Sequence, residues 1–235
     1  MKIDDLKGLY IAHRGIQTAK TIENTVPAFS LALDKKVPIE LDTHILKDGS
    51  IVVHHDDHLK RLMKIDREIS DYDYEELKKV TFPNTNIHIP LFQEVLDLVK
   101  GKVLIVIEIK RTKIISYKKY CQKILSILEK YPYDFVIKSF DVRIVHWFLK
   151  HTNYITGLLI ANRNHSFYDF LMQRKVTLSI LKPNFISVDA SIVSSKVVQN
   201  FRKKGPVLVW TIRDMDTLNR VRDKADSYLI EKFYF

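Results

Sequence analysis

Strand-like and helix-like runs alternate along the whole chain, and this alternation is the feature that most restricts its fold. Eight short apolar runs have the pattern of strands that are covered on both faces. They are Leu9–Ala12, Val37–Asp42, Val103–Ile109, Phe135–Ser139, Ile155–Ile160, Phe185–Val188, Val207–Thr211 and Ser227–Ile230. Strands spaced in this way along a chain indicate parallel strands that are connected by helices.

Helical runs, with apolar residues at three- and four-residue spacing, separate most of these strands. They are Thr25–Asp34, Phe92–Lys100, Ser116–Lys130, Asp141–Lys150, Phe167–Arg174, Ser194–Lys204 and Met215–Arg222. Eight strands with intervening helices predict an α/β fold of the (β/α)₈ TIM-barrel type, and the 235 residues are a usual length for one. The alternative arrangement of the same elements is an open, doubly wound sheet.

One stretch, from about residue 45 to residue 89, interrupts the regular alternation. It contains a strand at Ile51–His54, a polar segment and a short helix around Tyr74–Lys79. We interpret it as a small insertion in the loop after the second strand, on the face where barrel enzymes build their active sites. Because no linker, repeat or low-complexity tract divides the chain, we expect one domain over residues 1–235.

Composition limits the environment and the partners of the protein. The single cysteine, Cys121, excludes an intramolecular disulfide, and no apolar run is long enough to span a bilayer. Acids near the N-terminus are unlike a secretory signal, so we expect a soluble, cytoplasmic protein. The net charge of +10 permits peripheral contact with a membrane, but no basic run has the pattern of a nucleic-acid module. The sequence gives no indication of the oligomeric state.

Acidic side chains gather at the expected carboxyl ends of two strands. Glu40 and Asp42 are two residues apart and therefore point to the same face of their strand, and Glu108 lies at the end of another. Because these ends meet at one rim of a barrel, the three carboxylates would repel one another unless a cation lay between them. Carboxylate oxygens favour a hard cation, so we predict one bound Mg²⁺ or Ca²⁺.

Basic residues are expected at the same rim. Arg14 follows the first strand and Lys110 follows Glu108, and together with a metal they would form a clamp for a phosphate group. His13 and His55 are candidates for a general acid and base, because imidazole titrates near neutral pH. This set of residues indicates metal-assisted chemistry on a phosphoester.

A series of short motifs occurs in a fixed order along the chain. It consists of His13-Arg14-Gly15, Glu23-Asn24-Thr25, Glu40-x-Asp42, Lys47-Asp48-Gly49, Val52-Val53-x-His55-Asp56, Ile89-Pro90-Leu91, Glu108-Ile109-Lys110, Ser139-Phe140-Asp141 and Trp210-Thr211. In this order and spacing the chain resembles the glycerophosphodiester phosphodiesterases, from about Ile11 to Thr211. Each motif alone is weakly specific, whereas the ordered set is strongly specific.

The resemblance implies a role for each matching residue. Glu40, Asp42 and Glu108 would bind the metal, His13 and His55 would be the catalytic pair, and Arg14, Glu23, Asn24, Lys110 and Trp210 would contact or enclose the substrate. His44, His54 and His58 are interpreted as loop residues that do not bind a ligand. At its end the chain departs from the Thr-Asp-x-Pro segment usual in the family, because it reads Leu229-Ile230-Glu231-Lys232.

The implied reaction is metal-dependent hydrolysis of a glycerophosphodiester to glycerol 3-phosphate and an alcohol. A glycerol hydroxyl would attack the phosphorus while one histidine removes its proton and the other protonates the leaving alcohol. Two alternatives stay open. The same site could act on a lysophospholipid or a polymeric glycerophosphate, or the barrel could be a binding protein without catalysis.

Overall fold

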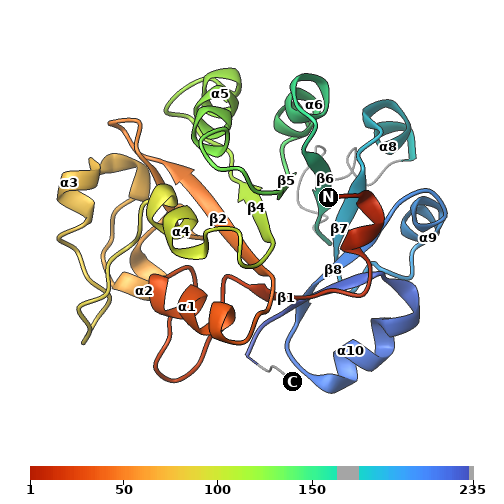
Figure 1. Ribbon diagram of the computed structural model, residues 1–235, viewed down its shortest axis with the longest axis horizontal. Helices are drawn as coiled ribbons and strands as arrows, with labels where there is room; N and C mark the ends of the chain where they lie inside the picture. The colour runs from red at the N-terminus through yellow and green to blue at the C-terminus, as the bar shows by residue number, and fades with distance from the viewer. Residues whose placement is uncertain (163–174, 233–235) are drawn as a thin grey trace.

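The computed structural model describes residues 1–162 and 175–232, and its core is a closed barrel of eight parallel strands (Figure 1). Around the barrel the strands follow the order β1, β9, β8, β7, β6, β5, β4 and β2. Pairing of Ala12 with Ile39 and of His13 with Glu40 joins β1 to β2 and closes the ring. The predicted (β/α)₈ barrel is thereby confirmed, and the open sheet is excluded.

All eight predicted strands are present, with modest shifts at their ends. They are β1 (Tyr10–His13), β2 (Ile39–Ile45), β4 (Ile105–Ile109), β5 (Phe135–Ser139), β6 (Ile155–Ile160), β7 (Phe185–Asp189), β8 (Val207–Ile212) and β9 (Ser227–Ile230). The longest extension is at β2, whose last residues pair with β3 (Ile51–Val53) in an antiparallel hairpin. That hairpin belongs to the segment interpreted as an insertion.

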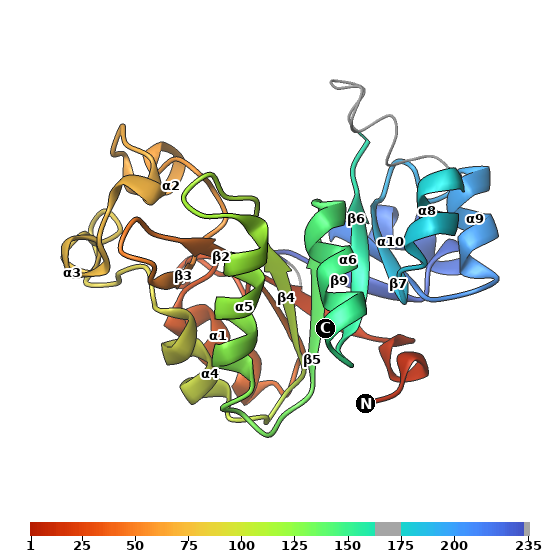
Figure 2. The same cartoon turned by 90° about the horizontal axis from the view of Figure 1, so that it is seen from above.

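Helices cover the outside of the barrel (Figures 1 and 2). They are α1 (Val26–Asp34), α4 (Phe92–Val99), α5 (Tyr117–Leu128), α6 (Val142–His151), α8 (Lys175–Leu181), α9 (Lys196–Arg202) and α10 (Met215–Val221). Side chains cap several N-termini, as Ser116 does for α5, Asp141 for α6 and Asp214 for α10. The helix predicted at Phe167–Arg174 lies outside the described residues. None of the described helices is long and apolar enough to cross a membrane.

The barrel interior changes from apolar to polar along the strands. Near the N-terminal ends of the strands, a single hydrophobic cluster fills the interior and is made of Leu6, Ile11, Val106, Val136, Phe185, Leu208 and Leu229. Two residues further along five of these strands, and therefore on the same face, stand His13, Glu108, Lys138, Trp210 and Glu231. Regular alternation thus places an apolar floor beneath a layer of functional groups.

The segment between β2 and α4 forms a small unit beside the barrel. It contains β3, α2 (Lys60–Met63), the 3₁₀ turn η2 (Ile69–Asp71) and α3 (Tyr74–Leu77). Its buried side chains, among them Leu59, Met63, Ile69 and Phe82, form a hydrophobic cluster of their own. In Figure 2 this unit lies at the opposite end of the molecule from α8 and α9. Its polar edge carries His55 to the rim of the barrel.

Two glycines are required by the backbone near this rim. Gly15 has a φ of +79°, and a Cβ there would lie 2.9 Å from backbone and side-chain atoms of Ala28 in α1. Gly49, with a φ of +85°, forms the turn between β2 and β3. The turn after β1 is tight enough that Arg14 also adopts a positive φ, of 62°. This conformation, which is rare for residues other than glycine, directs the backbone N–H of Arg14 to the Glu40 carboxylate.

Candidate active site

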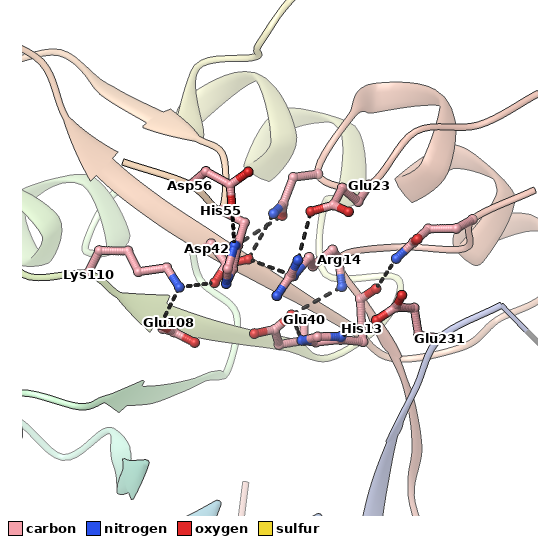
Figure 3. Close-up of polar contacts among 12 residues, drawn as sticks. His13, Arg14, Glu23, Glu40, Asp42, His55, Asp56, Glu108, Lys110 and Glu231 are labelled. Atoms are coloured by element: carbon pink, nitrogen blue, oxygen red, sulfur yellow. Dashed lines mark hydrogen bonds and ion pairs between the residues drawn. The ribbon is translucent and has the colours of Figure 1, made fainter. Parts of the chain in front are cut away.

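Three buried carboxylates from the neighbouring strands β2 and β4 lie together (Figure 3). Asp42 stands directly opposite Glu108 in the parallel pair, and Glu40 is two residues earlier on the same face of β2. One oxygen from each carboxylate lies within 4.8 Å of the others. Glu40 and Asp42 are fully buried and Glu108 is 5% exposed. Three unneutralised carboxylates at this separation would destabilise the fold, so the site must recruit cations.

The carboxylate oxygens of this triad that face Lys110 and Lys138 fit a divalent cation. Glu40 Oε1, Asp42 Oδ1 and Glu108 Oε1 accept no hydrogen bond of good geometry from any described residue. The ammonium groups of Lys110 and Lys138 approach them instead, at 2.6 to 2.8 Å. Three convergent carboxylate oxygens, which the lysine ammonium groups neutralise in the absence of a metal, form an all-oxygen donor set of the kind that Mg²⁺ or Ca²⁺ prefers. The residues present therefore fit the metal predicted from the sequence.

The remaining oxygens of Asp42 and Glu40 are held by residues of the loop after β1. Asn24 Nδ2 donates to Asp42 Oδ2 over 2.8 Å, and Arg14 Nε lies 3.3 Å from the same oxygen. The backbone N–H of Arg14 donates to Glu40 Oε2 over 3.1 Å. Burial raises the pKa of Asp42, but the nearby Lys110, Arg14 and His55 outweigh it and hold this pKa well below its usual range. Asp42 is therefore ionised at neutral pH despite its burial.

His13 is fixed from one side by a carboxylate. Its Nδ1 lies 3.3 Å from Glu231 Oε2, and its Nε2 lies 3.9 Å from Glu40 Oε2. Arg213 donates two hydrogen bonds to Glu231, over 3.1 and 3.3 Å. Burial opposes ionisation of Glu231, yet its hydrogen bonds to His13 and Arg213 lower its pKa to about 2. An ionised Glu231 places the ring hydrogen of His13 on Nδ1 and leaves Nε2 facing the acidic triad.

His55 has an equivalent arrangement on the other side of the site. Its Nδ1 lies 2.7 Å from Asp56 Oδ1, and Arg61 Nε donates to Asp56 Oδ2 over 2.6 Å. Arg61 also donates two hydrogen bonds to Glu23, which in turn accepts one from Arg14. Each histidine is thus oriented by a carboxylate that an arginine holds. His55 is about one-third exposed, whereas His13 is almost fully buried.

A cleft of about 1110 Å³ opens onto this network. Its walls include His55, Glu108, Lys110 and Phe140. The ring of Phe140 packs edge-to-face against Trp210, with 5.9 Å between the ring centroids. Lys110 lies 2.8 Å from Asp42 and 2.6 Å from Glu108, and these neighbours raise its pKa against the effect of burial. The cleft therefore has a permanently cationic group beside the acidic triad and an aromatic wall further out.

Comparison with known proteins assigns the chain to a family. A model of the glycerophosphoryl diester phosphodiesterase family matches residues 13–228, a range that includes every residue of the site network except Glu231. The chain belongs to this family. It is 34% identical over 146 residues to a glycerophosphodiester phosphodiesterase of Caldanaerobacter subterraneus subsp. tengcongensis. That alignment covers 58% of this chain and 59% of the relative, so the chain spans little more than half the length of that curated protein.

Two further relatives of this phosphodiesterase family extend the comparison. The crystal structure of a glycerophosphodiester phosphodiesterase from Thermotoga maritima superposes with a TM-score of 0.75 and 30% identity, covering 94% of each chain. Human lysophospholipase D GDPD1 is 44% identical over 69 residues, which are 29% of this chain and 22% of that protein. The first of these supports the barrel over the whole chain, and the second concerns a short segment.

The residues predicted from the sequence converge on one network. Direct hydrogen bonds or ion pairs join all of them except His55 and Trp210. His55 is linked to Glu23 through Asp56 and Arg61, and Trp210 reaches the cleft through Phe140. Five members of the network were not predicted as site residues, namely Asp56, Arg61, Lys138, Arg213 and Glu231. Lys138 contacts Glu40 from β5, and Glu231 contacts His13 from the residue after β9. Strand alternation was the available signal, because Lys138 follows Val136 and Glu231 follows Leu229 at a spacing of two.

Of His44, His54 and His58, which were interpreted as loop residues, only His44 lies in a regular element of the structure. His44 belongs to β2, and His54, directly after β3, is buried. His58 is in the loop before α2. Neither ring nitrogen of His54 has a hydrogen-bond partner within the described part of the chain. The β2–β3 hairpin, extended beyond the sequence-based boundary, accounts for the burial.

Burial lowers the pKa of His54 to about 3, which predicts a specific pH dependence of stability. Between about pH 6.5 and pH 3 the unfolded chain binds a proton that the folded state does not accept, so stability falls with pH by up to ~1.4 kcal/mol per unit. We expect His54→Leu to gain about 2 kcal/mol relative to wild type between pH 7.5 and pH 5. Urea unfolding at both pH values measures this, with the exposed His146→Leu as control. Equal pH dependence in all three proteins would contradict it.

Proposed function

We propose that the protein is a divalent-cation-dependent phosphodiesterase that hydrolyses glycerophosphodiesters to glycerol 3-phosphate and an alcohol. The observation that carries this proposal is the pair of histidines, each held by a carboxylate and an arginine, on the two flanks of a buried acidic triad. A site for acyl transfer or hydride transfer does not need this combination, whereas phosphoester hydrolysis needs a cation, a phosphate clamp and two groups that exchange protons.

Each group has a task that follows from its position. Arg14 and Lys110 would hold the phosphate, because both cations lie beside the triad and Lys110 lines the cleft. Glu40, Asp42 and Glu108 would hold the divalent cation, which when bound polarises phosphoryl oxygens and stabilises the charge that develops on them. Asn24 and Glu23 would keep Asp42 and Arg14 in place through their hydrogen bonds.

The two histidines would divide the proton transfers. One Nε2 accepts the proton of a glycerol hydroxyl as that oxygen attacks the phosphorus, and the other imidazolium donates a proton to the alcohol oxygen as its bond to phosphorus breaks. The first products are a free alcohol and a cyclic glycerophosphate. Water then opens the ring, with the proton transfers reversed, and glycerol 3-phosphate is released. Nδ1 of each histidine stays bound to its carboxylate throughout.

The proposal predicts release of glycerol 3-phosphate from glycerophosphocholine and glycerophosphoethanolamine by the purified protein. Release should require added Mg²⁺ or Ca²⁺ and should stop with EDTA, because without a divalent cation the triad is matched only by Lys110, Lys138 and Arg14, and the metal's stabilisation of phosphoryl charge is lost. A coupled assay for glycerol 3-phosphate, run with each metal and with chelator, measures it. Turnover that EDTA leaves unchanged would contradict the metal dependence.

A second candidate substrate class is the lysophospholipids. It is favoured by the match of a segment of this chain to human lysophospholipase D GDPD1 and by the aromatic wall of the cleft. Lysophosphatidylcholine, tested under the same conditions, distinguishes the two classes by the ratio of kcat/KM values. No hydrolysis of either class with either metal would overturn the proposed enzyme activity and favour a binding role.

A further inference from the structure

Lys138 is a buried cation at the floor of the acidic triad. It lies on β5, is 1% exposed, and its ammonium group lies 2.8 Å from Glu40 Oε1 and 3.9 Å from Glu108 Oε2. The hydrophobic cluster that contains Val136, two residues earlier on the same face of β5, lies beneath it. The cleft is lined by Lys110 but not, among the described residues, by Lys138. Lys138 is therefore placed to act on the metal-binding carboxylates and not on the substrate.

The charges of the site balance without any bound metal. Three carboxylates, Glu40, Asp42 and Glu108, are matched by three cations, Lys110, Lys138 and Arg14, all within 4 Å of a triad oxygen. Lys110 and Arg14 can turn toward a phosphate when substrate binds. Lys138 cannot turn toward the substrate in this way, because its side chain is enclosed by the barrel. A divalent cation that enters must therefore share Glu40 with a fixed positive charge only a few ångströms away.

We infer that Lys138 weakens and tunes the divalent-cation site, while it holds Glu40 and Glu108 in place when no cation is bound. This inference rests on the proposed metal site. Repulsion between an ammonium group and a divalent cation at this range is substantial even when the protein interior screens it strongly. In the metal-free protein, the same ammonium group compensates the charge of buried carboxylates that would otherwise destabilise the fold. The consequence is a preformed but exchangeable cation site, which an anionic phosphodiester completes.

Removing the charge of Lys138 while keeping a polar side chain tests the inference. We expect Lys138→Gln to bind Ca²⁺ at least ~10-fold more tightly than wild type by isothermal titration calorimetry, since one positive charge has been removed from the ligand shell. Lys138→Arg, which keeps the charge, should bind within about threefold of wild type. Lys123→Gln removes one exposed charge from α5, where Lys123 contacts the backbone of Gly49 and not the triad, and should leave the dissociation constant unchanged.

A second readout does not depend on calorimetry. Saturating Ca²⁺ should raise the melting temperature of Lys138→Gln more than that of wild type. The variant has lost the ammonium group that neutralises the triad, so bound Ca²⁺ stabilises its folded state by a larger amount. If Lys138→Gln does not fold, Lys138→Met, which keeps the length of the side chain, provides the same comparison.

The outcomes separate this inference from the proposed function. Equal or weaker Ca²⁺ binding by Lys138→Gln, with normal binding by wild type, would overturn the role of Lys138 and leave the metal site intact. No Ca²⁺ or Mg²⁺ binding by wild type, with no change in its melting temperature, would overturn the proposed metal site and this inference together. Tighter binding by Lys138→Gln and not by Lys138→Arg would support both.

Discussion

His13→Ala should lower kcat/KM for glycerophosphodiesters by ~10³-fold or more, because it removes one of the two groups that move protons in the proposed reaction. The loss should appear in kcat, since His13 is buried beside Glu40 and does not line the open part of the cleft. Steady-state kinetics with glycerophosphocholine measures the effect. The exposed His146→Ala serves as the matched control and should keep the full activity of wild type.

Glu231→Gln should have a smaller effect of the same kind. The amide can no longer hold the ring hydrogen of His13 on Nδ1 by charge, although it keeps nearly the same shape, so we expect kcat to fall by about 10- to 100-fold. Glu231→Asp should recover part of this loss. A purely structural role for Glu231 would instead lower the melting temperature and leave kcat of the folded protein unchanged.

Two results would contradict the proposed role of His13. More than about one-tenth of wild-type activity in His13→Ala would exclude it as a proton-transfer group. A loss accompanied by failure of Ca²⁺ to raise the melting temperature would indicate that the substitution had disturbed Glu40 and not the chemistry. Ca²⁺ titration of the same variant, monitored by thermal unfolding, therefore accompanies the kinetic measurement.

The barrel could be predicted from the sequence because its strands are buried on both faces. Runs such as Phe135–Ser139 and Ile155–Ile160 are apolar, short and separated by amphipathic helices, so their bounds were correct without information from other proteins. β2 was less predictable. Its last residues, Thr43, His44 and Ile45, extend beyond the barrel to pair with β3. From the sequence, the strand was expected to end at the barrel rim, so these three residues were assigned to the loop.

The site was predictable where residue chemistry and strand position agreed. Glu40, Asp42 and Glu108 stood out because carboxylates are unexpected within apolar strands. Lys138 was overlooked, since a lysine near a strand end is usually exposed and only the closed ring brings it to Glu40. Glu231 was overlooked because its partner His13 lies 218 residues away in the sequence and meets it only through the pairing of β1 with β9.

Asp42→Asn tests whether the ionised carboxylate of Asp42 stabilises or destabilises the metal-free fold. Two opposing effects act on Asp42, namely repulsion from Glu40 and Glu108 and attraction by Lys110 and Arg14. Attraction outweighs both repulsion and burial, because the pKa of Asp42 is held well below its usual range. Removing the charge would leave Lys110 and Arg14, both largely buried, with one fewer partner, and breaking a buried ion pair typically costs ~3–5 kcal/mol.

We therefore expect metal-free Asp42→Asn to be less stable than wild type at pH 7 by about 3 kcal/mol, with activity lost as well. Since ionised Asp42 stabilises the fold above its unfolded pKa near 4, the deficit should shrink as the pH falls below that value. Urea unfolding in EDTA at pH 7 and at pH 3.5 measures both, with Asp216→Asn on α10 as control. A variant as stable as wild type at pH 7 would mean that repulsion within the triad dominates, and a divalent cation would then be needed for the fold as well as for the reaction.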